Sequence, residues 1–404
     1  MNKKISLGVA ISLVAIGCAI TFVLTWTVSL RIYNSKIGNS EKYEGVYAKL
    51  REIDTTVRTN YIGSLSDDQL ENSVINGYVV GIGDPYASYM AASSYYELQQ
   101  TTGGIVNGAG FEAEEDGSGY LRVTNVYKGS SAELNGVEAG DVITEIDGKS
   151  LLTMESGTAA ERLSGEVGTH IALKLLRDGE EISVNLIRQQ LEIESVSGEM
   201  LEGSIGYISI TAFNAKTSDQ FSEVLNNLLN EGASAIIFDV RQNNGGLVSA
   251  LKPMLNRLIP AAIIATAEYS DGSRKTLVET DADENISIPM AVLVDGGTAS
   301  AAELFAVALR DECGAVLVGT QTYGKAVMQN TYEFSDGSAI TISTAKIYPS
   351  KSDSYDGVGL KPDYVTELPA GTLPSNLSAD ADAQLQKAIE VLAPKAEAQP
   401  RTAE

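Results

Sequence analysis

A serine, a lysine and a glutamine stand at spacings that could build a hydrolytic site. Ser300 follows an apolar, strand-like run and a glycine pair, and an apolar, helix-like run begins after it. Lys325 lies 25 residues further on, and Gln329 four residues after that. At such a strand-to-helix turn, backbone N–H groups are unpaired and the helix dipole favours negative charge. A nucleophile and an oxyanion site can be built there together, although a serine in this place is also an ordinary helix cap.

The histidine content limits which base could activate this serine. The only histidine, His170, lies in an alternating, strand-like run in a different part of the chain. A Ser-His-Asp triad would need it beside Ser300, so lysine, the known substitute, is the better candidate. A lysine must be neutral to act as a base, which requires desolvation that lowers its pKa from about 10.4, and the apolar residues 326–328 would provide this beside Lys325. The alternative is a solvated surface lysine.

Composition excludes several classes of partner and site. The chain has 404 residues and a net charge of −24, which argues against nucleic acid as a partner. It also disfavours binding to an anionic membrane surface. The two cysteines are Cys18 and Cys313, and the first lies in an apolar N-terminal run. We therefore expect neither an intrachain disulfide nor a thiolate metal site.

The N-terminal region predicts a membrane anchor. Two lysines precede an uncharged run from Ile5 to Leu30, and Arg31 follows. As a helix this run would span roughly 39 Å, enough to cross a bilayer with some tilt. We therefore expect a cytoplasmic tip and one uncleaved transmembrane helix in residues 1–39, with the catalytic part outside the cytoplasm. Residues 40–102 show helical periodicity and form a predicted N-terminal helical segment.

Residues 103–190 show a different pattern of apolar and turn residues. Short alternating runs separated by Gly-Asp turns predict a small β-rich module. The loop Gly108-Ala109-Gly110-Phe111 precedes one of these runs. Such a loop can point backbone N–H groups at the terminal carboxylate of a peptide while the next strand pairs with the peptide. Glycines before a strand are common, so the loop alone is weak support.

Residues 191–370 alternate between apolar strands and helices, which predicts a largely parallel sheet buried on both faces. The glycine pairs Gly245-Gly246 and Gly296-Gly297 fall where two of these strands end. The first could supply an N–H group to an oxyanion and the second could form the serine turn, or both could be tight turns only. Residues 371–404 predict a last helix and a disordered tail from Pro394 onward.

Together these stretches resemble a known family. Residues 130–143, with the loop at Gly108, closely resemble a PDZ domain. Residues 297–303, with Gly324-Lys325, Gln329 and the turn 239–246, resemble the carboxyl-terminal processing peptidases, Ser-Lys proteases with an embedded PDZ domain. Asp84-Pro85-Tyr86-Ala87-Ser88-Tyr89 resembles the N-terminal helical segment of that family, although its tyrosines are most simply explained as packing residues.

The resemblance implies a role for each matching residue. Ser300 would be the nucleophile, Lys325 the general base, and Gln329, one helical turn further on, would hold the lysine in place. The N–H groups of Gly246, or Gly245, and of Ala301 would form the oxyanion hole. Gly108, Ala109, Gly110 and Phe111 would bind the end of a polypeptide. No metal or organic cofactor is needed.

The resemblance also implies a fold and a function. We expect an α/β protease core with crotonase-like ββα elements and a mostly parallel sheet, an inserted PDZ domain, the N-terminal helical segment and one transmembrane helix. The expected activity is that of a membrane-anchored serine endopeptidase that cleaves exported proteins near their C-terminal tails, with a homodimer as one option. The alternatives are a catalytically silent PDZ scaffold or sensor and, less favoured, a crotonase-like acyl-CoA enzyme.

Overall fold

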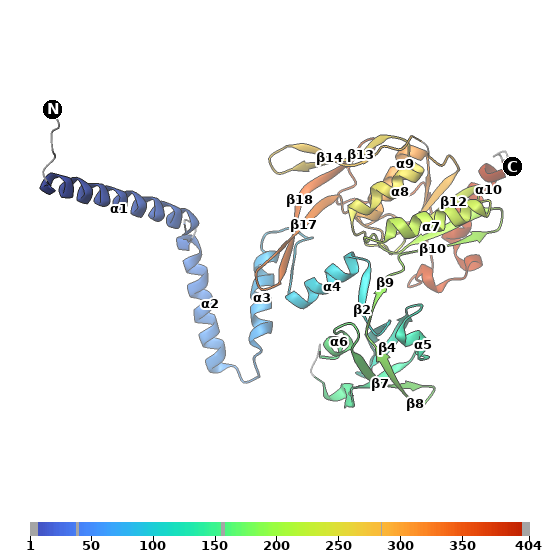
Figure 1. The fold of residues 1–404 in the computed structure, drawn as a ribbon. Helices are drawn as coiled ribbons and strands as arrows, with labels where there is room; N and C mark the ends of the chain where they lie inside the picture. Colours follow the sequence, from blue (N-terminus) through green and yellow to red (C-terminus); the bar gives the residue numbers. More distant parts are fainter. Residues whose placement is uncertain (1–6, 38–39, 155–157, 284, 398–404) are drawn as a thin grey trace. The chain divides into compact units, whose positions relative to one another are not determined.

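The computed structural model describes residues 7–37, 40–154, 158–283 and 285–397. The chain divides into two units, Met1–Ile75 and Asn76–Glu404. The first unit contains the helices α1 (Leu7–Ile37) and α2 (Ser40–Asn60) and the start of α3 (Asp67–Val80), as Figure 1 shows. Residues 40–102 contain α2, α3 and a further helix, α4 (Ala92–Thr102).

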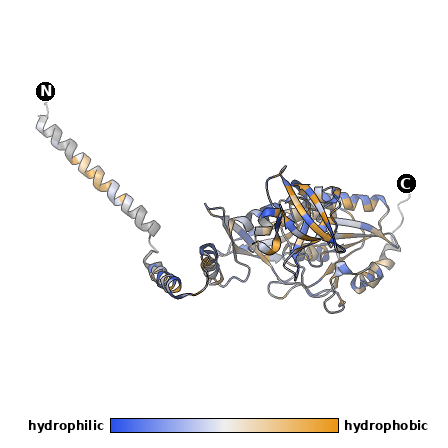
Figure 2. Cartoon of the chain, turned by 90° about the horizontal axis from the view of Figure 1, so that it is seen from below, coloured by the Kyte–Doolittle hydropathy of each residue, from blue (hydrophilic) through white to orange (hydrophobic). Residues whose placement is uncertain are grey.

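The predicted transmembrane helix is not supported. The side chains of Phe22 and Trp26 on α1 are exposed. Figure 2 shows hydrophobic residues, in orange, along the middle of this helix. Nevertheless, within the described ranges no helix is long and apolar enough to cross a membrane. The prediction rested on the absence of charge from Ile5 to Leu30, and absence of charge is a weaker criterion than the length and hydropathy that a span requires.

The β-rich module forms one antiparallel sheet with the strand order β3-β4-β5-β7-β8. Its buried core contains Val123, Ile143, Ile171 and Leu175, none more than 1 % exposed. The first and last strands of the module, β2 and β9, pair with each other as a separate two-stranded sheet. The elements are β2 (Ile105–Gly108), β3 (Phe111–Glu115), β4 (Leu121–Val126), α5 (Ser131–Leu134), β5 (Val142–Ile146), β6 (Lys149–Ser150), α6 (Thr158–Leu163), β7 (His170–Arg177), β8 (Glu180–Ile187) and β9 (Gln189–Glu192).

A second sheet, with the order β10-β11-β12-β15-β16-β19, carries the serine turn. Five of its strands run parallel, namely β11, β12, β15, β16 and β19, and β10 pairs antiparallel with β11 at one edge. Strands β12 and β15 are buried along their whole length, as expected for strands covered on both faces. The strands are β10 (Val196–Leu201), β11 (Ile205–Ile210), β12 (Ala235–Asp239), β15 (Met290–Val294), β16 (Val316–Gly319) and β19 (Tyr364–Val365).

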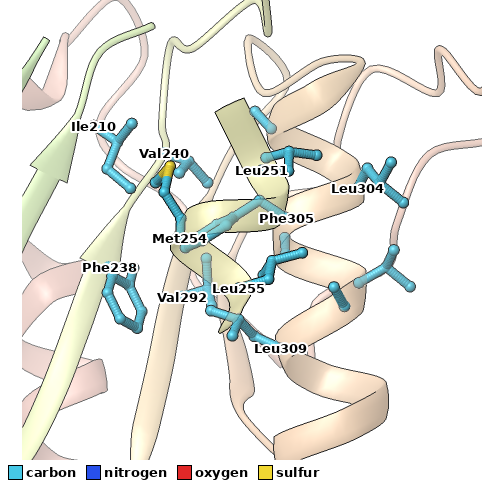
Figure 3. Packing of buried hydrophobic residues seen from close by; sticks show 14 of the residues in the cluster. Ile210, Phe238, Val240, Leu251, Met254, Leu255, Val292, Leu304, Phe305 and Leu309 are labelled. Atoms are coloured by element: carbon cyan, nitrogen blue, oxygen red, sulfur yellow. The ribbon is translucent and has the colours of Figure 1, made fainter. Parts of the chain in front are cut away.

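Helices cover both faces of this sheet. On one face α7 (Thr217–Asn230), α8 (Leu251–Leu258) and α9 (Ala301–Cys313) enclose a cluster in which Phe238 and Phe305 meet edge to face, with ring centroids 5.5 Å apart (Figure 3). On the other face Leu385, Ala388 and Leu392 of α10 (Ala383–Glu397) pack against β12 and β15. This packing fixes the carboxyl ends of β12 and β15, where the glycine turns lie.

The remaining strands correct the predicted fold class. They form an antiparallel sheet of β1 (Ser88–Met90), β18 (Ala339–Pro349), β13 (Ala262–Tyr269) and β14 (Arg274–Thr280), with β17 (Val327–Glu333) also paired to β18. The described sheets are thus mostly antiparallel or mixed, and the prediction of a mostly parallel fold is wrong. Apolar strands alternating with helices correctly indicated the strands around the serine, but local patterns do not encode which distant hairpins pair.

The C-terminal helix is longer than expected. Helix α10 includes Pro394 and ends at Glu397, whereas the sequence predicted disorder from that proline onward. The rest of the predicted tail, 398–404, lies outside the described residues. Strands β17 and β18 pair antiparallel as a hairpin, and Gln329 lies within β17.

Candidate active site

The serine turn connects β15 to α9. Ser300 has φ 55°, a value that non-glycine residues rarely adopt. Asp295 at the end of β15 holds the turn, because its Oδ1 accepts the N–H groups of Gly297 at 2.9 Å and Thr298 at 3.1 Å. A serine in a rare backbone conformation that the surrounding bonds maintain points to a functional constraint rather than to an ordinary cap.

The second glycine turn lies directly against the serine turn. A Cβ atom on Gly245 would lie 2.9 Å from Cβ of Ser300, and one on Gly246 would lie 2.1 Å from the carbonyl oxygen of Phe213. Both glycines also have positive φ, at 100° and 132°. Ala299 donates its N–H to the carbonyl of Asn243 at 2.9 Å, which joins the two turns. Only glycine therefore permits this approach.

Two backbone N–H groups are available at this junction. Within the described residues, the N–H groups of Gly246 and Ala301 have no hydrogen-bond partner. The N–H of Gly245 is already donated to Oδ1 of Asn243 at 2.8 Å. Of the two glycines that the sequence offered as oxyanion donors, Gly246 is thus the one with a free donor. Ala301 is the first residue of α9, where the helix dipole also favours an anion.

A buried carboxylate joins the serine turn to the lysine loop. Glu303 on α9 has no exposed surface. Its Oε2 accepts the N–H of Ser300 at 2.9 Å and the N–H of Lys325 at 2.8 Å. Its Oε1 accepts the hydroxyl of Thr322 at 2.6 Å and the N–H of Gly324 at 2.7 Å. The backbones of the predicted nucleophile and base are therefore held by the same oxygen atom.

Lys325 and Gln329 are in direct contact, although not on a helix as expected. Nζ of Lys325 donates to Oε1 of Gln329 at 2.6 Å. Lys325 lies in a loop, and Gln329 lies on β17, directly after a bulge at Met328. The expected contact assumed that the two residues lie one helical turn apart. Instead, a loop and a bulged strand bring their side chains together, and helical periodicity does not describe this geometry.

Burial lowers the pKa of Lys325 from its ordinary value of 10.5, while the nearby carboxylates of Asp84 and Glu303 act in the opposite direction. The amine lies 5.2 Å from the ring centroid of Tyr86. Gln329 donates its Nε2 to the backbone carbonyl of Tyr86 at 2.7 Å, which orients its amide oxygen toward the lysine. The neutral form of the Lys325 amine is therefore more favoured in this site than it would be at an exposed position.

Sequence reasoning missed three residues of this site. It interpreted Tyr86 as a packing residue and gave no role to Asp84 or Glu303. A signal existed for Glu303, since a glutamate three residues after a serine at a helix start is the capping-box pattern. No local signal pointed to Tyr86, because its contact with Gln329 joins residues 243 positions apart.

The predicted peptide-binding loop lies at the edge of the β-rich module. Gly108 ends β2, Phe111 begins β3, and β3 is an edge strand of its sheet. Within the described residues, the N–H groups of Ala109 and Gly110 have no hydrogen-bond partner. Gly110 has φ 102°, and a Cβ atom there would lie 2.1 Å from Cβ of the buried Ser130. Free donors beside a free strand edge suit a terminal carboxylate.

The centre therefore offers a hydroxyl, a desolvated amine and two free N–H donors, which is the set that acyl transfer requires. The described part of the chain contains no group of three or more His, Cys, Asp and Glu side chains that could hold a metal ion.

Comparisons with known proteins find similarity over most of the chain. Residues 204–366 match the family model described as peptidase family S41, and residues 122–177 match a PDZ domain model. The carboxy-terminal processing protease CtpA of Bacillus subtilis is 30% identical over 372 residues, which cover 91% of this chain and 78% of that protein. The carboxyl-terminal-processing protease of Synechocystis is 30% identical over 327 residues, which cover 79% of this chain and 76% of that protein.

Among solved structures, a putative S41 protease from Bacteroides fragilis superposes with a TM-score of 0.51 at 18% identity. The match covers 85% of this chain and 97% of that structure, and it supports the fold alone.

Proposed function

The chain belongs to peptidase family S41 and is a serine-type peptidase, and we propose that Ser300 and Lys325 are its catalytic dyad. The observation that carries this proposal is the shared oxygen of Glu303, which accepts N–H groups from both residues. Two further features support it. Burial lowers the pKa of the lysine, and the N–H groups of Gly246 and Ala301, unpaired within the described residues, lie where the two turns meet.

The proposed reaction proceeds in two steps. Oγ of Ser300 attacks the carbonyl carbon of the scissile bond as its proton passes to neutral Nζ of Lys325. The N–H groups of Gly246 and Ala301 stabilise the oxyanion. The lysine then returns the proton to the leaving amine, and water hydrolyses the acyl-enzyme by the same route. Gln329 keeps the amine directed by its 2.6 Å hydrogen bond.

The proposed substrates are polypeptides recognised by their C-terminal ends. The N–H groups of Ala109 and Gly110 would bind the terminal carboxylate, and the adjacent edge of β3 would pair with the tail. The CtpA relative from Bacillus subtilis is named for carboxy-terminal processing, which agrees with this choice. The extent of the domains, with the PDZ domain at 103–190 and the protease core at 191–370, is part of the same proposal.

The test compares four purified full-length proteins: wild type, Ser300→Ala, Lys325→Met and the exposed-residue control Glu223→Gln on α7. Each is mixed with casein and with a synthetic peptide, in free-acid and C-terminally amidated forms. We expect the wild type and the control to hydrolyse the substrates, and both dyad variants to lose at least about a thousandfold in kcat. Amidation should weaken binding to every protein, including Ser300→Ala.

Two outcomes would contradict the proposal. Activity that persists in Lys325→Met would remove the lysine from the mechanism. A wild-type protein that binds the free-acid peptide but cleaves nothing would favour the alternative, a PDZ scaffold or sensor without catalysis.

A further inference from the structure

A loop far from the dyad in sequence is built around the amine of Lys325. The loop contains Asp84 and Tyr86 and lies between α3 and β1. Asp84 fixes it to β18, because its Oδ2 accepts the N–H of Ser343 at 2.8 Å and its Oδ1 accepts the hydroxyl of the same residue at 3.1 Å. Oδ1 also accepts the N–H of Tyr86 at 3.0 Å, which sets the position of the tyrosine.

These bonds complete a closed circuit. Ser343 is the register partner of Gln329 across the β17–β18 pair. Gln329 donates to the carbonyl of Tyr86 and accepts from Nζ of Lys325. The ring of Tyr86 then lies 5.2 Å from the same Nζ atom. The amine therefore donates to the amide oxygen of Gln329 and lies beside an aromatic ring. The backbone carbonyl of Tyr86 orients the amide, and its side chain provides the ring.

The tyrosine ring is itself packed in place. It lies 6.4 Å from the ring of Tyr323, centroid to centroid, and its hydroxyl is 3.4 Å from the carbonyl oxygen of Gly324. The hydroxyl bond is long and therefore weak. The ring, rather than the hydroxyl, is the part that matters for the lysine, because it occupies space that water would otherwise fill.

We propose that Tyr86 is a positioning residue that keeps the Lys325 amine dry and directed for its role as base. This inference rests on the proposed dyad. A covering ring has two opposite effects: it removes water, which disfavours the ammonium form, and its π-face attracts the ammonium form. Desolvation is the largest influence on the pKa of Lys325 and lowers it, so we expect the loss of water to prevail.

Other charged groups around the amine set the direction of the test. Asp84 beside β1 and Glu303 on α9 both favour the ammonium form. Asp356, from the loop after β18, accepts the N–H of Ala326 at 3.3 Å. With carboxylates on three elements, water admitted by a smaller side chain would let the ammonium form become stable. Removing the ring should therefore raise the pKa of Lys325.

The experiment measures kcat and KM of the full chain from about pH 5 to about pH 10 with one tail peptide, because the acid limb of kcat reports the base in the enzyme–substrate complex. The variants are Tyr86→Phe, Tyr86→Leu and Tyr86→Ala, with Tyr332→Ala as a control at an exposed tyrosine of β17. Circular dichroism of each variant checks that it folds.

We expect Tyr86→Ala to move the acid limb by about one unit to higher pH, which lowers kcat about tenfold below the limb and restores it above. Tyr86→Phe and Tyr332→Ala should retain the wild-type profile, and KM should change less than about threefold. Tyr86→Leu keeps the site dry without a π-face, so its limb should stay in place or move to lower pH. If Tyr86→Ala does not fold, Tyr86→Val replaces it, because this smaller side chain also admits water beside the amine and should move the acid limb to higher pH.

Three results would overturn the inference: a Tyr86→Ala profile lowered equally at every pH, an acid limb that does not move, or a leucine limb that moves upward as far as the alanine limb. Lys325→Met separates this failure from failure of the proposed function. If that variant is inactive and the Tyr86 variants leave the profile unchanged, only the role of Tyr86 is wrong.

Discussion

At the scale of single residues, Glu303 links the chemistry to the structure. A carboxylate without solvent access is costly unless donors surround it. Here three backbone N–H groups and one hydroxyl converge on it, from Ser300, Gly324, Lys325 and Thr322. Each donor belongs to the serine turn or the lysine loop. The carboxylate therefore sets the separation of the two backbones, and its burial makes that separation rigid.

Replacing Glu303 by glutamine should disrupt this junction. One acceptor oxygen becomes an NH₂ group that faces two donors, so we expect Glu303→Gln to lower the free energy of unfolding by about 3 kcal/mol. The kcat should fall at least about a hundredfold, because the nucleophile and the base lose their common support. Urea unfolding and peptide hydrolysis measure the two effects, with Glu223→Gln on α7 as the control. Wild-type kcat in a destabilised Glu303→Gln would show that the carboxylate serves stability alone.

At the scale of secondary structure elements, two turns at the carboxyl ends of β12 and β15 create the site. The turn after β12 contains Gly246, pressed against the carbonyl of Phe213. The turn after β15 contains Ser300. Neighbouring parallel strands bring their carboxyl ends to one edge. The pairing of β12 with β15 therefore places an N–H donor beside the nucleophile.

Gly246→Ala should strongly lower kcat and leave tail binding intact. The added Cβ would lie 2.1 Å from the carbonyl oxygen of Phe213, so the turn must move and its N–H must leave the serine. Loss of one oxyanion donor costs roughly a hundredfold to a thousandfold in kcat. Gly272→Ala in the β13–β14 hairpin is the matched control, since its φ is 79° but nothing lies within 4 Å of an added Cβ.

Steady-state kinetics measure the first effect, and titration with the free-acid peptide measures the second. A Gly246→Ala enzyme as active as Gly272→Ala would exclude this N–H as an oxyanion donor.

The same elements show what the sequence could predict. Apolar runs bounded by glycine pairs indicated β12, β15 and the serine turn, because burial on both faces leaves a local signature. The antiparallel pairing of β13 with β14 and with β18 left no such signature, so the sheet was assigned wrongly. Gln329 was expected on a helix and lies on a bulged strand. Residues 84–89 were noted for their resemblance, but the role of Tyr86 could not be derived, because its contact with Gln329 joins residues 243 positions apart.

At the scale of the whole protease core, residues at the start of α10 contact the turn that follows β12. Arg241 lies two residues beyond β12. Its Nη2 atom forms ion pairs with Asp239 at 2.6 Å and with Asp382 at 2.7 Å. All three side chains are almost fully buried. Gln384 on α10 accepts from Nη1 of the same arginine at 2.9 Å. The residue after the arginine, Gln242, donates its N–H to Asp295 of the serine turn at 2.9 Å.

This chain of contacts predicts that a substitution near the C-terminus weakens both folding and catalysis. In Asp382→Asn the Oδ1 acceptor for the start of α10 remains, since it binds the N–H groups of Gln384 and Leu385 at 3.0 Å. One of the two carboxylate charges paired with Arg241 is lost, which should cost about 3 kcal/mol of unfolding free energy because the arginine is buried. The arginine can then shift toward Asp239, and Gln242 with it.

We therefore expect kcat to fall about tenfold while KM changes little, because the displacement reaches the oxyanion turn and not the tail-binding loop. Lys387→Ala is the control: it removes an ion pair with Glu390, whose carboxylate is mostly exposed, and should cost less than about 1 kcal/mol. Denaturant unfolding and hydrolysis of one tail peptide measure both quantities. An Asp382→Asn protein that loses stability but keeps the kcat of Lys387→Ala would confine the ion pairs of Arg241 to folding and separate the end of the chain from the chemistry.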